Sequence, residues 1–258
     1  MKDAAAAVGV GGAMTVIVIS NIMEGGSPSA LLLPAPMLLV WGATILISIA
    51  GGTMSDAKSI IPNLKRAMVG KAESSADVVP VVVGLADKAR KEGLLALEDS
   101  LKDIEDEFLV KGVTMAIDGT DPEEMRDILE GEVAAKRAAT KHSAKFFTDA
   151  GAYAPTIGII GTVMGLVHVL ENLAKPEELG HLIASAFIAT LWGVMSANVF
   201  FMPIGNRLKR LGELEVSRME VTIEGVLAIQ AGANPRVVAT KLRSKMQPPG
   251  PGAVKEAA

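Results

Sequence analysis

The sequence contains no cysteine among its 258 residues, and this absence excludes disulfide bonds, thiolate metal sites and cysteine nucleophiles. Aromatic side chains are also rare, with six Phe, two Trp and one Tyr. The net charge is −4 at pH 7, so the chain offers no broad basic face. Proteins that bind nucleic acid need such a face, or aromatic platforms on which bases stack. We therefore expect no nucleic-acid partner.

Charge is missing from four long blocks, although 21% of all residues are charged. Each block is close to the ~20 residues that a helix needs to cross a hydrocarbon core of about 30 Å. The predicted transmembrane spans are Ala4 to Met23, about Ala35 to Gly52, Ala150 to Leu170, and Leu182 to Gly205. The fold class that follows is an all-α integral membrane protein with four transmembrane helices.

The first block has a second interpretation, a secretory signal peptide, because Lys2 precedes an apolar stretch. Two features favour a transmembrane span instead. The block is not closed by a small-residue cleavage pattern, and Glu24 ends it abruptly. We therefore treat it as the first span.

Lys and Arg are distributed unevenly among the connections between the spans. Residues 56–149 carry fourteen of them and residues 206–258 carry nine, whereas residues 24–34 carry none and residues 171–181 carry only Lys175. Positively charged connections stay on the cytoplasmic side of a membrane. We therefore predict a multi-pass protein of the cell (cytoplasmic) membrane with both termini in the cytoplasm.

This topology divides the chain into four segments. Residues 1–55 hold spans one and two with a short external turn, and residues 149–205 hold spans three and four. Residues 56–148 form a large helical cytoplasmic insertion between them. Residues 206–258 form a cytoplasmic C-terminal helix and then a tail that is rich in Pro, Gly and Ala after Met246. A tail of this composition is expected to be disordered.

Two patterns predict helices in the insertion. Apolar residues recur at spacings of three and four from Leu94 to Leu109. Residues 120–124, Thr-Asp-Pro-Glu-Glu, form a helix start, with a capping side chain, an early proline and carboxylates at the positive end of the helix dipole. The helix that begins there can continue into span three without a breaker before Pro155.

An ion-conducting membrane protein normally carries a carboxylate inside a span, because so costly a group is retained there for function. The four predicted spans of this sequence contain neither Asp nor Glu. If the protein moves an ion, another chain must supply the carboxylate. The competing interpretation is that the spans only anchor the cytoplasmic segments.

Spans three and four carry side chains that plain anchors do not need. Gly161 and Gly165 form a GxxxG pair, which lets two helices approach closely. Span four contains Thr190, whose hydroxyl can line an aqueous path or bond to a carbonyl of its own helix. Pro155 and Pro203 lie near the cytoplasmic ends of these spans, where each frees a carbonyl and permits a kink. Ordinary bending of a helix end would also explain both prolines.

Several longer stretches carry a family resemblance. They are Leu31 to Pro36, Ala89 to Glu98, Asp118 to Glu124, Gly151 to His168, Pro176 to Gly180, and Ala189 to Gly193 followed by Pro203. In this order, over nearly the whole chain, they resemble the MotA/PomA family of flagellar stator proteins, within the superfamily that includes TolQ and ExbB. Four spans with a large insertion favour the flagellar branch, because TolQ and ExbB normally have three.

The resemblance implies a complex and a mechanism. Five copies of the chain would surround two copies of a partner, MotB, whose single membrane helix carries the ion-binding aspartate. Ions that enter from outside neutralise that aspartate, the ring turns, and the insertion pushes on the rotor protein FliG. The implied function is ion-driven torque, with no enzyme activity and no cofactor besides the transported H⁺ or Na⁺.

The resemblance also assigns two hydroxyls to the ion pathway. Thr190 corresponds to the hydroxyl beside the ion path. Thr162 bears on the choice of ion, because sodium-type members resemble this chain in having a hydroxyl there. Hard cations prefer oxygen ligands, so two hydroxyls near a carboxylate fit part of a sodium shell. Thr162 can also bond within its own helix, so both ions stay open.

Four more residues receive roles in the same way. Pro155 and Pro203 correspond to the prolines of conformational coupling. Arg90 and Glu98 correspond to the charged pair that binds the rotor. From the residues alone, Arg90 and Glu98 would be interpreted as part of a solvated helix face.

Three alternatives remain. One is a TolQ/ExbB-like ion-driven energiser of an envelope system. Another is a membrane enzyme, which is disfavoured because the spans hold no carboxylate pair, no cysteine and no Ser–His constellation. His168 and His181 could nevertheless ligate a metal across the external turn. The last alternative is a scaffold without conductance.

Overall fold

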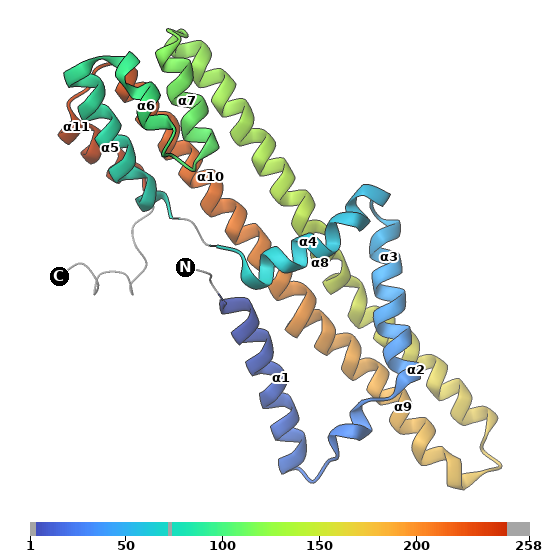
Figure 1. Cartoon of the computed structure of the whole chain (residues 1–258). Helices are drawn as coiled ribbons and strands as arrows, with labels where there is room; N and C mark the ends of the chain where they lie inside the picture. The colour runs from blue at the N-terminus through green and yellow to red at the C-terminus, as the bar shows by residue number, and fades with distance from the viewer. Residues whose placement is uncertain (1–3, 72–73, 247–258) are drawn as a thin grey trace. The chain divides into compact units, whose positions relative to one another are not determined.

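The computed structural model describes residues 4–71 and 74–246 (Figure 1). In chain order the elements are α1 (Ala5–Met23), η1 (Pro28–Leu31), α2 (Pro34–Met37), η2 (Leu38–Ala43), α3 (Thr44–Ala50), α4 (Met54–Val69), α5 (Ser75–Glu92), η3 (Leu94–Leu97), α6 (Glu98–Leu101), α7 (Glu107–Ile117), α8 (Pro122–Glu171), α9 (Pro176–Met195), η4 (Ser196–Phe201), α10 (Met202–Gln230) and α11 (Pro235–Lys245). The segments η1 and η3 are 3₁₀-helical, and η2 and η4 are π-helical. These residues contain no β-strand, which confirms the all-α prediction.

Within residues 4–71 and 74–246, three helical stretches are long and apolar enough to cross a membrane. They are α1, the apolar part of α8, and the continuous stretch Pro176–Gln230 that α9, η4 and α10 form together. A shorter apolar helix, Pro34–Ala50, comprises α2, η2 and α3. Each of the four stretches contains or overlaps one of the four blocks found in the sequence. The protein is therefore an all-α integral membrane protein with four transmembrane helices and a helical insertion.

The described residues pack into two compact units. The first contains residues 4–71 and 140–211, and the second contains residues 74–139 and 212–246. Residues 56–71 and 140–148 thus pack with the spans, although the sequence assigns them to the cytoplasmic insertion. A packing unit does not mark a membrane boundary, so the four predicted segments stay predictions. The tail predicted after Met246 lies outside the described residues.

Aromatic rings join span two to span four in the first unit. The ring centroid of Trp41, in η2, lies 5.4 Å from that of Phe200 and 5.3 Å from that of Phe201, both in η4. Trp192 of α9 contacts Trp41 edge-on, with the centroids 6.3 Å apart. Aromatic pairs in such arrangements stabilise a fold beyond the effect of the area they bury. We call Trp41, Trp192, Phe200 and Phe201 the aromatic cluster.

The π-helical segment η4 has a visible cause in the sequence. Pro203 has no N–H group, and its ring clashes with the carbonyl four residues earlier, that of Val199 inside η4. The backbone N–H of Met202 bonds to the carbonyl of Ala197, five residues back, as in a π-helix. The helix accommodates the proline by this bulge and continues. Pro203 therefore shapes span four without ending it.

The second unit has a hydrophobic core of its own. Helices α5, α7, α8, α10 and α11 each contribute a fully buried side chain to it, namely Val82, Val113, Leu129, Val226 and Leu242. The helix start predicted at residues 120–124 is confirmed, because α8 begins at Pro122 and the Asp121 side chain accepts a hydrogen bond from the backbone N–H of Glu123 at 2.9 Å. The helix then runs for 50 residues, past Pro155.

The apolar spacing from Leu94 to Leu109 does not correspond to one continuous helix. Gly93 adopts a positive φ of 88° and ends α5, after which the chain forms η3, α6 and the first residues of α7. Asp106 then caps α7 by accepting hydrogen bonds from the backbone N–H groups of Phe108 and Leu109. The turn at Gly93 thus ends α5 just before the pattern begins, and the break before α7 divides the pattern into short helical pieces that pack against the core.

Candidate functional site

Helices α8 and α9 approach most closely along a line of small residues in the first unit. A Cβ atom added to Gly158 would lie 2.9 Å from the carbonyl oxygen of Ala189 and 3.1 Å from Cα of Gly193. A Cβ atom added to Gly193 would lie 2.8 Å from the carbonyl oxygen of Ala154. Real Cβ atoms essentially never come so close to backbone, so the contact requires glycine.

The same line continues toward the C-terminal end of α8 and the N-terminal end of α9. Added Cβ atoms on Gly161 and Gly165 would lie 2.6 Å from the methyl groups of Ala189 and Ala186, respectively. We call Gly158, Gly161 and Gly165 of α8, with Ala186, Ala189 and Gly193 of α9, the glycine seam. The predicted role of the GxxxG pair in close helix packing is thereby confirmed.

The glycine seam brings Thr162 and Thr190 into direct contact. Their hydroxyl oxygens form a hydrogen bond across the seam, and both side chains are half-buried. Thr162 Oγ1 also lies 3.1 Å from the carbonyl oxygen of Gly158 and 3.1 Å from that of Ala186, either of which can accept its proton. The bond to Gly158 is the within-helix contact that the sequence allowed for, and the other two contacts reach α9.

Four oxygen atoms therefore cluster at one point between spans three and four. They belong to the two hydroxyls and to the carbonyls of Gly158 and Ala186. Oxygen is the ligand that hard cations prefer, but none of these atoms carries a formal charge. The cluster can form part of the coordination shell of a cation, but it cannot balance the charge of that cation.

Among the described residues, no group of three or more His, Asp or Glu side chains is arranged to hold a metal. His168 and His181, which the sequence left open as metal ligands, are both exposed. In the described chain, neither belongs to a group of three metal-binding side chains. The oxygen cluster at Thr162 and Thr190 remains the strongest candidate site in the spans.

The two predicted coupling prolines lie near the glycine seam and the first-unit core. Pro155 follows Ala154, which is fully buried and whose carbonyl faces Gly193. Pro203 lies between Phe201 and Ile204, and both of these side chains are buried in the core that contains Ala154. Each proline is thus next to a residue that fixes how α8 packs on the end of span four. Their role in conformational coupling stays a prediction.

The two predicted rotor-binding residues lie in the second unit and do not contact each other. Arg90 is exposed in the last turn of α5, and Glu98 is exposed in the first turn of α6. The turn at Gly93 and the segment η3 separate them. In the described part of the chain neither residue forms an ion pair with another residue, so both charges face solvent. Their role at the rotor stays a prediction.

Two contributors to the site, Gly158 and Gly193, are visible in the sequence, but their contact with each other was not predicted. Gly158 continues the spacing of Gly161 and Gly165 along one face of a helix, so the sequence held a signal for it. Gly193 ends one of the stretches that carry the family resemblance, but no contact was predicted for it. Its closest contacts are Ala154 and Gly158, and a sequence alone gives no register between two helices that are far apart along the chain.

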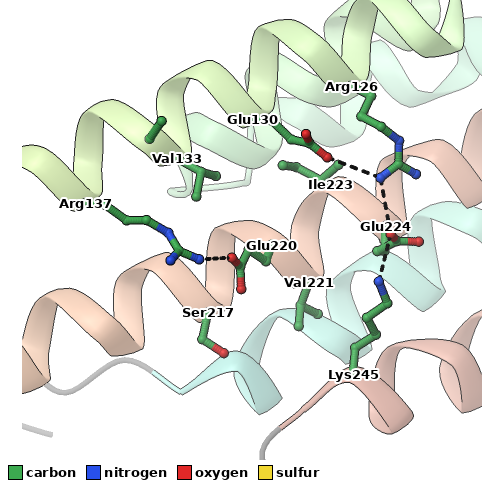
Figure 2. A pocket seen from close by; sticks show the side chains of 11 residues that line it. Arg126, Glu130, Val133, Arg137, Ser217, Glu220, Val221, Ile223, Glu224 and Lys245 are labelled. Atoms are coloured by element: carbon green, nitrogen blue, oxygen red, sulfur yellow. Dashed lines mark hydrogen bonds and ion pairs between the residues drawn. The ribbon is translucent and has the colours of Figure 1, made fainter.

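A groove of about 480 Å³ in the second unit is the other candidate (Figure 2). Helices α8 and α10 line it, and Lys245 of α11 lies at its edge. Arg137 pairs with Glu220, and Arg126 lies 3.4 Å from both Glu130 and Glu224. Each charge in the groove is compensated by a neighbour. The charged side chains of the groove therefore stabilise the packing of the helices and leave no unpaired charge for a charged ligand.

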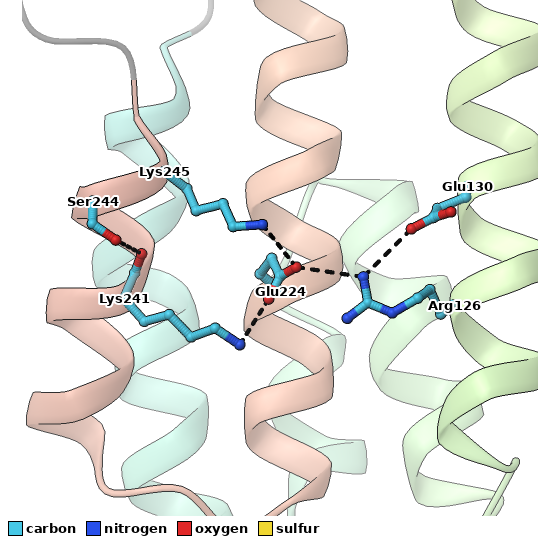
Figure 3. Close-up of polar contacts among 6 residues, drawn as sticks. All are labelled: Arg126, Glu130, Glu224, Lys241, Ser244 and Lys245. Carbon is cyan, nitrogen blue, oxygen red and sulfur yellow. Dashed lines mark hydrogen bonds and ion pairs between the residues drawn. The ribbon is translucent and has the colours of Figure 1, made fainter.

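Glu224 is the centre of this charge network (Figure 3). Its side chain is only 10% exposed, and it lies 2.8 Å from Lys241 Nζ and 3.1 Å from Lys245 Nζ, both in α11. The hydrogen bond from Lys241, with a second from Lys245, lowers the pKa of the Glu224 carboxyl to about 2 in spite of its burial. Glu224 therefore holds α11 against α10 as a charged group at physiological pH.

We expect Glu224→Gln to destabilise the full-length protein by on the order of 2 kcal/mol at pH 7. The folded-state pKa lies below the ordinary value of 4.5, so this stabilisation is present above about pH 4.5 and is lost as the pH falls toward 2. Urea unfolding of the purified chain in detergent, followed by circular dichroism, measures it. The two proteins should differ at pH 7 and converge below pH 3.

Glu105→Gln is the matched control for this change. Glu105 is exposed, and within the described residues it has no ion-pair partner, so the substitution should leave the unfolding midpoint unchanged. An equal loss in both variants, or a difference that persists at low pH, would contradict the role given to Glu224.

Comparisons with known proteins agree with these features. The model of the MotA/TolQ/ExbB proton channel family matches residues 100–221. The chain is 38% identical to Motility protein A of Bacillus subtilis, over 93% of this chain and 89% of that protein. It is 31% identical to chemotaxis protein PomA of Vibrio alginolyticus, over 94% of each.

Two solved structures are similar over nearly the whole fold. The structure of C. jejuni MotAB superposes with a TM-score of 0.91 at 30% identity, and covers 96% of this chain and 98% of its own. The flagellar MotAB stator complex of Bacillus subtilis gives a TM-score of 0.88 at 36% identity, with 97% and 98% covered. Similarity of this extent includes the spans, the insertion and the C-terminal helices.

Proposed function

Because this chain belongs to the MotA/TolQ/ExbB proton channel family and is a flagellar stator subunit, we propose that Thr190 and Thr162 form the part of its ion pathway that the chain itself supplies. The observation that carries this proposal is the hydroxyl pair across the glycine seam. It lies in spans that contain no carboxylate. The pair can solvate a passing cation, but it needs a charged partner.

The partner is a MotB-like subunit with a single membrane helix that brings an ion-binding aspartate to this hydroxyl pair. Support comes from the two similar structures, that of C. jejuni MotAB and that of the Bacillus subtilis MotAB stator complex. A cation that binds the aspartate neutralises it, and a neutral acid crosses an apolar environment at far lower cost than a carboxylate. When the ion binds or leaves, the charge of the aspartate changes. The surface of this chain against which the aspartate is most stable changes with it.

The assembly contains several copies of this chain, and five around two partner subunits is the arrangement we propose. Large apolar side chains remain exposed on the described spans, including Val163, Val167, Phe187, Leu191 and Val194. The first span has no buried residue within the chain. Exposed apolar surface on spans is available to lipid and to neighbouring copies. The chain is an inner-membrane protein, and both termini are placed in the cytoplasm by the distribution of Lys and Arg.

Torque reaches the rotor through the second unit. Arg90 and Glu98 present one charge of each sign to solvent, which suits a partner surface with alternating charges, and we assign that partner to the rotor protein FliG. Each charge that crosses a potential of 100 mV releases about 2.3 kcal/mol, so sustained torque needs many coupled transits. Pro155 and Pro203 sit where bending of α8 or of span four would pass from the hydroxyl pair toward this unit.

The transported ion is H⁺ or Na⁺, and swimming assays distinguish them. Cells that depend on this stator and its partner are tracked across a sodium series at fixed pH, with and without a proton uncoupler. Because a second hydroxyl favours a hard cation, we expect speed to follow sodium and to survive the uncoupler. Speed that ignores sodium and stops with the uncoupler would make the ion a proton. Absence of swimming under all conditions would contradict the stator function.

A further inference from the structure

Trp192 makes a hydrogen bond that lies outside both the hydroxyl pair and the glycine seam. Its indole N–H donates to the backbone carbonyl of Leu31 at 2.7 Å, and its side chain is 8% exposed. Leu31 is the last residue of η1, in the connection between spans one and two. A backbone carbonyl outside regular helix needs a partner when water is excluded, and the indole provides it.

The ring of Trp192 is fixed as well as its N–H group. It contacts Trp41 of span two edge-on and packs with Val40, Ile188 and Met195 in a separate apolar core. Met14 of span one also packs against this core. Trp192 therefore joins α9 to span two through its ring and to the connection between spans one and two through its N–H group, within a core that span one also contacts.

Thr190 and Trp192 lie on opposite sides of α9. Two residues correspond to about 200° of rotation around a helix with 3.6 residues per turn. Trp192 faces η1 and η2, and Thr190 faces Thr162 across the glycine seam. The seam is made of glycine and alanine, so its shape resists rotation of α9 less than interlocking side chains would. The rotation of α9 must then be set from its other side.

We propose that Trp192 is a positioning residue of the ion pathway, which fixes the rotation of α9 through its bond to Leu31 and thereby holds the Thr190 hydroxyl against Thr162. The inference has two parts, and only the effect on ion passage rests on the proposed function. The geometric part concerns the contact between two side chains, and it can be measured independently of swimming.

The absence of cysteine allows a direct measurement of that contact. In the otherwise cysteine-free chain, Thr162→Cys with Thr190→Cys should form a disulfide in membranes under mild oxidation, because the two side chains touch. Adding Trp192→Phe keeps a ring but removes the N–H donor. We expect the yield of the disulfide to fall about threefold, the size of effect that loss of one hydrogen bond produces.

Trp41→Phe is the matched control, because it changes the neighbouring indole ring, for which the described chain gives no hydrogen bond. It should change the yield of the disulfide by no more than about one quarter, since the edge-on contact with Trp192 is retained. A benzothienyl analogue of tryptophan at position 192, which has the shape of indole without its N–H, replaces Trp192→Phe if that variant does not reach the membrane. An unchanged yield in the variant at position 192, or an equal loss in Trp41→Phe, overturns the proposal.

Ion dependence then separates the positioning role from the proposed function. In the chain without introduced cysteines, Trp192→Phe should raise the ion concentration for half-maximal swimming speed by about threefold, with unchanged protein in the membrane. If the disulfide yield falls but neither Trp192→Phe nor Thr190→Val alters ion dependence, the positioning role is supported. The assignment of the ion pathway to the hydroxyl pair is then what fails.

Discussion

Swimming is lost when Gly193 is replaced by valine; this is the largest effect we expect from a single substitution. The new Cβ would lie 2.8 Å from the carbonyl oxygen of Ala154 and 2.9 Å from Cα of Gly158, both backbone atoms that cannot turn away. Helices α8 and α9 must separate, at a cost of roughly 1–3 kcal/mol or more, and the contact between the two threonine hydroxyls breaks. Swimming speed and the amount of protein in the membrane are the measurements.

Gly180→Val is the control that isolates the seam. It introduces the same side chain into the same helix, α9, at a position where an added Cβ meets no atom within 4 Å. Its effect on speed should be small, because valine has no steric conflict there and a slightly better helix propensity than glycine. Swimming that survives Gly193→Val at normal protein levels would show that close packing of α8 on α9 is not needed.

Thr190→Val should lower swimming speed at least about tenfold while leaving protein levels normal. Valine has nearly the shape of threonine but no oxygen, so the substitution removes one ligand of the oxygen cluster and leaves Thr162 without its partner across the seam. Thr190→Ser keeps the hydroxyl and should retain most of the speed. Speed under constant load, measured on tethered cells, reports the loss without interference from cell shape.

The control for hydroxyl loss is Thr15→Val in span one. The Thr15 hydroxyl donates to the carbonyl of Gly11 in its own helix at 2.9 Å, and we expect its removal to change speed little. Similar losses in Thr15→Val and Thr190→Val would indicate a general effect of apolar substitution in the spans. The hydroxyl pair would then have no special part in ion passage.

The membrane helices could be predicted from the sequence because charged side chains are costly in lipid, so a long block without them indicates a span. The blocks that lack Asp, Glu, Lys and Arg became α1, the helix from Pro34 to Ala50, the end of α8 and the stretch through η4. The helix start at Asp121 was equally local, since capping involves residues two or three positions apart. Features that depend on neighbours along the chain were therefore accessible from the sequence.

Features that depend on register between distant helices were not. The sequence identified Thr162 and Thr190 separately, but their contact follows from the crossing of α8 and α9 at Gly158 and Gly193. The bond between Trp192 and Leu31 joins residues 161 positions apart, and the sequence gave no indication of it. In the insertion, the break between α6 and the cap of α7 at Asp106 interrupts an apolar spacing that by itself fits a continuous helix.

The two flanks of α9 differ in how much they oppose motion. On the flank toward α8, the glycine seam brings backbone against backbone and methyl groups, so a sliding displacement needs no change of rotamer. On the other flank, Trp192 meshes with Trp41 of span two, and rings of this size cannot pass one another without repacking. Span four thus packs on α8 through small residues, and on span two through interlocking rings. A shift of span four against α8 would therefore move span two with it.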